Sequence, residues 1–293
     1  MTRSKATAIG FSAVMMWALL AVLTIGSAPV PPFLLSTLCF AIGGIIGLAW
    51  TARGAGLRVL RTVPWRVYAF GTLGLFGYHF LYFTAFRIGP SAATGLIAYL
   101  WPLFIVLLSG LLPGETLRRG HIIGAVVALC GAGLIVVSAG AGNSTNPLAL
   151  VLAFLCALTW SSYSVLSRRF GAVPTESVTV FCLATAALSL AAHLAFEQTS
   201  WPASPVGWLS IAALGIGPVG AAFFTWDIGM KKGDIQLLGV ASYAAPLLST
   251  LVLVAAGVAQ PTVTLAVATV LITAGAALAA KASAARPVIA PDA

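Results

Sequence analysis

Residues 89–103 read GPSAATGLIAYLWPL, and residues 233–247 read GDIQLLGVASYAAPL. The two stretches lie about half the chain apart and share two glycines, a tyrosine and a Pro-Leu pair at the same spacing. A proline inside an apolar helix removes a backbone donor and kinks the helix. The sequence therefore predicts two kinked helices in equivalent positions of an internal repeat.

The similarity extends outward from these stretches through most of both halves. The further matched positions are Trp17 and Trp160, Val22-Leu23 and Val165-Leu166, Val30-Pro31 and Val173-Pro174, Cys39 and Cys182, Gly71 and Gly215, Phe80 and Phe224, Gly131 and Gly275, and Leu134 and Leu278. Each match is weak alone, but all occur in the same order. We expect two repeats, at residues 1–143 and 144–293, each with an odd number of membrane spans. The second repeat is then inverted, as in many secondary transporters.

Composition places the chain in a membrane. Hydrophobic residues make up 60% of it and charged residues 7%, with a mean hydropathy of +1.05, far outside the range of soluble domains. Continuous apolar runs without alternation favour helices over a barrel. Windows long enough to span a bilayer lie at 6–25, 33–51, 66–87, 91–112, 121–139, 147–168, 176–196, 207–230, 235–256 and 262–281. The expected fold is an all-α integral membrane protein, with ten transmembrane helices as two inverted five-helix repeats around a central cavity.

The basic residues predict the orientation. Of the 15 Lys and Arg residues, only Arg87 falls on the side opposite the others. Cytoplasmic loops carry the excess of Lys and Arg, so we expect both termini in the cytoplasm and the chain in the inner membrane. The net charge of +9 is scattered and forms no nucleic-acid motif. The four cysteines lie in apolar runs without metal-ligand spacing, and neither a metal nor a cofactor is expected.

These features resemble a known family. The chain resembles the drug/metabolite transporter superfamily, EamA type, in its five-plus-five spans. It also resembles this superfamily in the start of 91–112 at Gly89-Pro90-Ser91-Ala92-Ala93, in the prolines Pro102 and Pro246, and in Gly114-Glu115-Thr116-Leu117. Tyr78-His79-Phe80-Leu81-Tyr82 and Tyr99-Leu100-Trp101-Pro102 resemble its aromatic amino-acid exporter (YddG-like) branch. The resemblance implies a central cavity and export of small metabolites. Ala259-Gln260 stands where a repeat mate of Glu115 would be, so we interpret Glu115 as a cytoplasmic cap of 121–139.

The helix at 66–87 has the densest cluster of polar aromatic residues. Tyr78 and Tyr82 share a face, and His79 lies next to it. An ionisable residue deep in a membrane indicates a functional site, so we expect His79 to line the cavity. The alternative is a neutral histidine bonded to a neighbouring helix.

The remaining candidates come in repeat mates. Tyr99 and Tyr243 each precede a proline, which predicts paired cavity walls, with Pro102 and Pro246 as gating or hinge residues. Trp101 precedes Pro102 directly. Trp17 and Trp160 lie near mid-membrane, and Tyr163 follows in a polar run; helix packing explains these three equally well. The predicted substrate-binding residues are Trp17, Tyr78, His79, Tyr82, Tyr99, Trp101, Trp160, Tyr163 and Tyr243.

The acidic and basic residues argue against certain transport mechanisms and substrate classes. Asp227 stands four residues before Lys231, which predicts an ion pair; a proton-coupling carboxylate is the alternative. The first span contains no acid, which argues against the proton exchange of small multidrug transporters. The basic residues lie at the interfaces, which argues against phosphorylated substrates.

We therefore expect a secondary transporter, functional as a monomer, that exports neutral metabolites by alternating access. Aromatic amino acids are the favoured substrates, and other amino acids or drug-like metabolites are the alternative. A channel would need a selectivity filter, which is not visible. A membrane-embedded enzyme would need clustered acids and histidines, and the three His and six acids are dispersed. We expect no enzyme activity.

Overall fold

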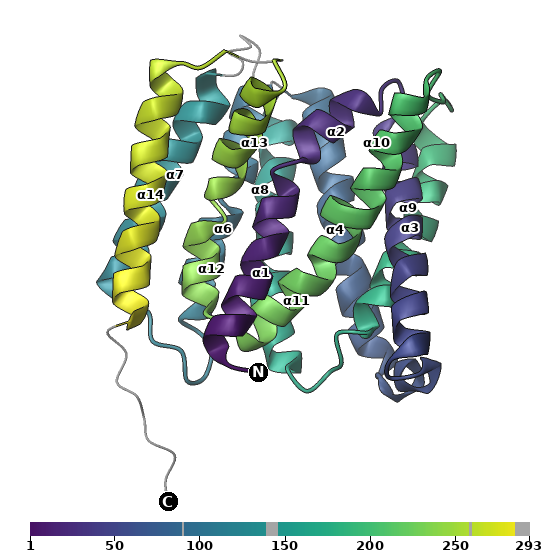
Figure 1. The fold of residues 1–293 in the computed structure, drawn as a ribbon, viewed down its shortest axis with the longest axis horizontal. Coiled ribbons are helices and arrows are strands. Elements are labelled where there is room, and N and C mark those ends of the chain that lie inside the picture. Colours follow the sequence, from purple (N-terminus) through teal and green to yellow (C-terminus); the bar gives the residue numbers. More distant parts are fainter. Residues whose placement is uncertain (90, 139–145, 258–259, 285–293) are drawn as a thin grey trace, which may run out of the picture.

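The computed structural model describes residues 1–89, 91–138, 146–257 and 260–284, and these residues form helices and no strand (Figure 1). The helices are α1 (Arg3–Trp17), α2 (Leu20–Gly26), α3 (Pro32–Arg53), η1 (Leu57–Thr62), α4 (Trp65–Ile88), α5 (Ser91–Ala98), α6 (Trp101–Ser109), α7 (Arg119–Ser138), α8 (Pro147–Ser167), η2 (Arg168–Phe170), α9 (Ser177–Phe196), α10 (Pro205–Ile216), the π-turn η3 (Gly217–Ala221), α11 (Ala222–Lys232), α12 (Ile235–Ala241), α13 (Ala244–Ala255) and α14 (Val263–Ala284).

Eight helical segments of the described chain are long and apolar enough to cross a membrane. The chain is therefore a multi-pass membrane protein. The other two predicted spans, 66–87 and 91–112, are not among these eight segments. At 24 residues α4 is long enough, but its tyrosines, histidine and glycines lower its hydropathy. The span predicted at 91–112 is represented by a shorter apolar stretch, Thr94–Ser109.

Four predicted spans are not continuous helices. The sequence analysis predicted the kinks in 91–112 and 235–256, whereas the breaks in 6–25 and 207–230 are corrections to it. The window 6–25 breaks between α1 and α2, 91–112 between α5 and α6, 207–230 at η3, and 235–256 between α12 and α13. Pro102, Pro218 and Pro246 each lie at or within a few residues of a break, where the missing N–H weakens the helical ladder. The break after Trp17 has no proline, so nothing in the sequence indicated it.

The two repeats run in opposite directions. Arg3 at the start of α1 and Arg168 just after α8 both contact Glu115, so these two points lie at the same end of the molecule. Because α1 and α8 are repeat mates, one mate begins where the other ends. α1 also begins at the end where α14 finishes, the lower end in Figure 1. The boundary predicted at residues 143 and 144 lies outside the described residues.

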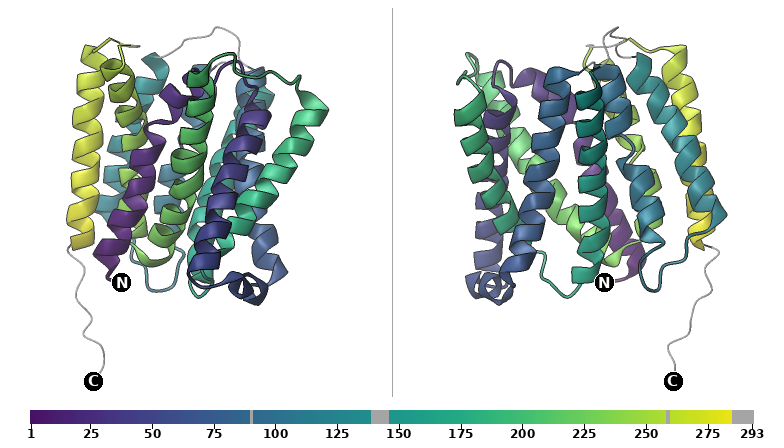
Figure 2. Two further views of the ribbon diagram at one scale, coloured as in Figure 1. Left: turned by 45° about the vertical axis from the view of Figure 1, so that its right-hand side comes forward. Right: turned by 180° about the vertical axis from the view of Figure 1, so that it is seen from behind.

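Helix packing follows the repeat. α3 lies along its mate α9, and α7 lies along its mate α14. α1 packs on α11, and its mate α8 packs on α4. Because α4 is the repeat mate of the α10–α11 segment, these two contacts are equivalent and match a twofold relation between the repeats. Figure 2 shows the helices from two further sides. Glycines permit the closest contacts: a methyl group on Gly10 of α1 would lie 2.8 Å from the Cα atom of Gly229 of α11. These pairs leave a central space bounded by both repeats.

Candidate substrate cavity

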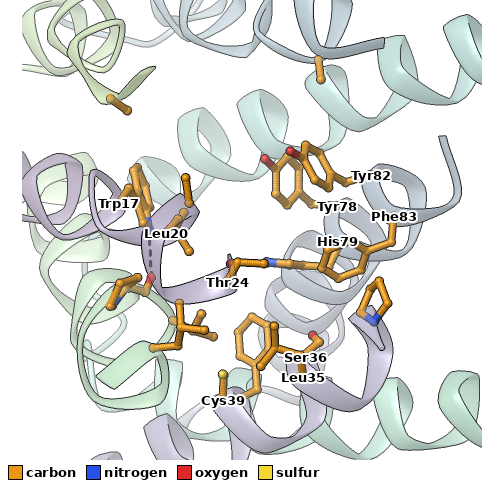
Figure 3. Close-up of a pocket in the computed structure, with 18 of the residues that line it drawn as sticks. Trp17, Leu20, Thr24, Leu35, Ser36, Cys39, Tyr78, His79, Tyr82 and Phe83 are labelled. Carbon is orange, nitrogen blue, oxygen red and sulfur yellow. Dashed lines mark hydrogen bonds between the residues drawn. The ribbon is translucent and has the colours of Figure 1, made fainter. Parts of the chain in front are cut away.

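A cavity of about 540 Å³ lies in the half of the molecule away from Arg3 and Ala284. Its walls come from α2, the first half of α3, the second half of α4, the α5–α6 break, α8, the region around η3, and α13 (Figure 3). The volume is in the usual range for small-molecule sites. Lining residues near the molecular end, such as Thr24 and Pro32, are exposed, whereas those deepest in the cavity are buried. The cavity therefore has an accessible rim and a closed floor.

Tryptophans from both repeats form the floor. Trp17 lies at the end of α1. The centroid of its ring is 6.1 Å from that of Trp101 and 5.9 Å from that of Trp160. Trp226 packs against Trp17 at 5.1 Å without lining the cavity. The Trp17 indole N–H donates to the carbonyl oxygen of Pro218 in η3 at 3.0 Å, an acceptor made available by the irregular turn. The sequence indicated Trp17, Trp101 and Trp160 individually, and the structure brings them together.

The face predicted on α4 forms one wall. The rings of Tyr78 and Tyr82 stack at 5.9 Å, and their hydroxyls point the same way in Figure 3. Phe86 packs against Tyr82 in a tilted arrangement, with ring centroids 4.4 Å apart, but does not line the cavity. The His79 ring also lines the cavity and contacts Phe40 edge-on at 5.0 Å. The wall therefore combines flat rings with hydroxyl and imidazole groups.

The structure separates the predicted site residues into two sets. Those that line the cavity are Trp17, Tyr78, His79, Tyr82, Tyr99, Trp101 and Trp160. Tyr163 is buried behind Trp160, with its ring against Phe70. Tyr243 is fully buried between the repeats, where its hydroxyl accepts a hydrogen bond from the backbone N–H of Leu103. Pro102 and Pro246 lie in the first turns of α6 and α13, outside the lining.

Four spans are tied together at the end opposite the rim. Glu115 lies 3.1 Å from Arg3 and 2.7 Å from Arg168 between their charged atoms, and Arg3 also lies 3.6 Å from Asp234. Arg168 donates to the carbonyls of Met230 and Gly233 at the end of α11. We call Arg3, Glu115, Arg168 and Asp234 the ion-pair cluster. It connects the ends of α1 and α8 to the segment after α6 and the start of α12, a role of Glu115 that the sequence did not reveal.

The pair predicted between Asp227 and Lys231 is confirmed at 2.9 Å. Thr175 donates a second hydrogen bond to the same carboxylate oxygen, and Lys231 also donates to the Val173 carbonyl. The pair holds α11 to the segment before α9. In the described part of the chain, no group of three or more His, Cys, Asp or Glu residues could hold a metal ion.

The sequence model of the EamA-like transporter family matches the chain twice, at residues 4–137 and 147–281. The chain belongs to the EamA-like transporter family. It is 55% identical over 284 residues to the aromatic amino acid exporter YddG of Ancylobacter novellus, covering 95% of this chain and 98% of that protein. The YddG exporter of Salmonella typhimurium is 28% identical over 267 residues, covering 85% and 88%. A solved crystal structure of a protein at 54% identity superimposes with a TM-score of 0.91, covering 97% of this chain and all of that one.

In this EamA-like transporter the two family repeats contribute unequally to the cavity. Six of the seven predicted residues that line it come from the first repeat, and only Trp160 comes from the second. The second repeat instead contributes lining residues that sequence analysis missed, including Phe223, Ala245 and Ser249. Phe40, Thr24 and Ser36 of the first repeat were missed as well. Among these missed residues, Thr24, Ser36 and Ser249 are polar residues in apolar helices, and this is the signal that could have identified them.

Proposed function

We propose that this protein exports aromatic amino acids across the inner membrane by alternating access, as a monomer with ten spans and both termini in the cytoplasm. The observation that carries the proposal is an aromatic cavity open at one end and closed at the other by tryptophans and ion pairs. Relatives at 55% and 28% identity carry the name aromatic amino acid exporter, which supports the substrate class. α4 and the α5–α6 pair complete the ten spans in this proposal.

The cavity suits a flat, partly polar molecule. Offset-stacked and edge-on ring pairs stabilise by about 0.5–1.5 kcal/mol beyond the area they bury. The Tyr78 and Tyr82 rings and the floor of Trp17, Trp101 and Trp160 offer such contacts to a substrate ring. The hydroxyls of Tyr78, Tyr82 and Tyr99 have no hydrogen-bond partner in the described part of the chain. They remain available to the polar groups of a substrate.

Alternating access requires that the closed end opens. Below the tryptophan floor the ion-pair cluster joins the ends of α1, α6, α8 and α12. Opening the cytoplasmic side therefore means separating these ion pairs. The breaks between α5 and α6 and between α12 and α13 lie close to the cavity, so each half-helix can tilt about its break. Pro102 and Pro246 are the hinge residues of this proposal.

The orientation is tested with single cysteines in a background without the native ones. Ala203 lies in the exposed loop before α10, and Ala55 lies in the exposed loop before η1, at the opposite end. In intact cells an impermeant thiol reagent should label Ala203→Cys and spare Ala55→Cys until the membrane is opened. The reverse labelling pattern would show that the protein has the opposite orientation in the membrane, and the proposal of export would then be wrong.

The substrate class is tested by flux in proteoliposomes. Uptake of labelled tryptophan and phenylalanine should saturate and should be stimulated by unlabelled substrate on the other side, which a channel does not show. Leucine, glutamate and lysine serve as comparisons. If leucine moves as fast as phenylalanine, the broader class of neutral amino acids replaces the aromatic one. If no amino acid moves, the proposal is wrong.

A further inference from the structure

The two ring nitrogens of His79 are in different situations. Nδ1 lies 2.7 Å from the carbonyl oxygen of Leu75, one turn earlier in α4. A carbonyl oxygen can only accept a hydrogen bond, so Nδ1 must carry the hydrogen. In a neutral imidazole Nε2 then holds the lone pair. The backbone of α4 therefore fixes the tautomer of this histidine.

The surroundings of His79 favour the neutral ring. Its ring neighbours are Phe40 at 5.0 Å, Phe83 at 5.9 Å and Phe223 at 6.1 Å, with Tyr78 beside it. Among the described acids, Glu115, Glu197, Asp227 and Asp234 form ion pairs elsewhere, and Glu176 lies at the start of α9. An imidazolium here would have no counter-ion, and an unpaired charge in an apolar setting is costly.

The Nε2 lone pair has no hydrogen-bond donor within the described chain, although the ring lines the cavity. It is therefore an acceptor that the described chain leaves available to a ligand in the cavity. The rings of Phe40 and Phe223 stack at 5.3 Å beside it, and both line the cavity. Aromatic faces attract cations. This side of the cavity offers an acceptor and ring faces, and both favour a positive group.

We propose that Nε2 of His79 accepts a hydrogen bond from the α-ammonium group of the transported amino acid, and so selects amino acids over the corresponding carboxylic acids. This inference rests on the proposed function and names the group that recognises one end of the substrate. The hydroxyls of Tyr78 and Tyr82, turned to another part of the cavity (Figure 3), are donors for the carboxylate. The substrate ring then lies against the tryptophan floor.

The test is equilibrium binding to purified protein in lipid nanodiscs. Labelled phenylalanine is displaced by phenylalanine, by 3-phenylpropionate, which lacks the ammonium group, and by phenethylamine, which lacks the carboxylate. His79→Phe keeps a ring but removes both nitrogens. This substitution should lower the affinity for phenylalanine and for phenethylamine about tenfold, which is the usual effect of losing a hydrogen bond to a charged group. It should leave 3-phenylpropionate unchanged. His79→Gln, whose amide oxygen can accept, should retain most of the affinity for phenylalanine.

Two outcomes would overturn the assignment. If the binding of all three ligands weakens equally, the His79 ring only packs. If binding weakens only for phenylalanine and 3-phenylpropionate, the two ligands that have a carboxylate, His79 donates a hydrogen bond rather than accepting one. If the parent protein binds none of the three, the proposed function itself fails. Nitrogen-15 NMR of the unaltered protein avoids any folding defect in the variants. The Nε2 signal of His79 should move on addition of phenylalanine and stay in place with 3-phenylpropionate; an unmoved signal with phenylalanine rejects the contact.

Discussion

The hydroxyl of Tyr243 accepts a hydrogen bond of 3.0 Å from the backbone N–H of Leu103, across the interface between the two repeats. Leu103 lies in the first turn of α6, where backbone N–H groups have no partner inside the helix. Tyr99, the repeat mate of Tyr243, lines the cavity, and its hydroxyl has no hydrogen-bond partner in the described chain. Two equivalent positions in the sequence therefore serve different purposes in this conformation.

The same substitution should affect the two tyrosines differently. Tyr243→Phe leaves a buried N–H without an acceptor, which costs about 1–3 kcal/mol of stability. Tyr99→Phe breaks no hydrogen bond within the described chain and should leave stability unchanged while weakening substrate binding. Thermal unfolding in detergent and binding of labelled phenylalanine measure the two effects. Equal melting temperatures for both variants would show that the bond to Leu103 contributes little.

The ion-pair cluster should control access from the cytoplasm. Glu115→Gln removes the charge that attracts both Arg3 and Arg168, so the cytoplasmic side should open more often. Ala13 of α1, fully buried between the cluster and the tryptophan floor, reports this opening when replaced by cysteine. Thiol labelling of Ala13→Cys from the cytoplasmic side should become several-fold faster in the Glu115→Gln background, because a smaller energy gap raises the population of the open state.

Glu176→Gln is the matched control for Glu115→Gln. Glu176 lies near the same end of the molecule, at the start of α9, and its carboxylate does not cap that helix. Its replacement should leave the labelling rate of Ala13→Cys unchanged. If both substitutions accelerate labelling equally, a general effect of charge explains the result. If neither does, the cluster is not the cytoplasmic gate.

The periodic and compositional features of this protein could be predicted from its sequence. Hydropathy located the helices, the spacing of Tyr78 and Tyr82 placed them on one wall, and the four-residue spacing of Asp227 and Lys231 gave a pair that the structure confirms. These are local properties of helices. They require no knowledge of how distant segments pack.

Features that depend on conformation could not be predicted. A sequence repeat treats Tyr99 and Tyr243 as equivalent, whereas one conformation of an inverted repeat places them in different surroundings. The break after Trp17 has neither proline nor glycine beside it, and the bond from Trp17 to Pro218 joins residues far apart in the chain. The partners of Glu115 are equally distant. Only tertiary packing determines such contacts.

A ring that binds substrate should be distinguishable from a ring that only packs. Tyr82 lines the cavity. Phe86 packs against the Tyr82 ring, with centroids 4.4 Å apart, but does not line the cavity. Tyr82→Ala should weaken phenylalanine binding several-fold, since a ring contact contributes about 1 kcal/mol beyond area burial. Phe86→Ala should lower the melting temperature at least as much as Tyr82→Ala does, and it should leave phenylalanine binding nearly unchanged. Equal losses of binding in both variants would place the substrate elsewhere.

The buried pair of Asp227 and Lys231 should be structural. Both side chains are nearly inaccessible, and Asp227 also accepts from Thr175. Removing one partner of a buried pair leaves an uncompensated charge, which typically costs about 3–5 kcal/mol. Asp227→Asn should therefore lower the melting temperature strongly, and the double variant Asp227→Asn with Lys231→Met should recover part of the loss. Transport by the double variant should respond to a proton gradient as the parent does. A stable Asp227→Asn protein that has lost only its response to the gradient would instead make Asp227 a proton-coupling residue.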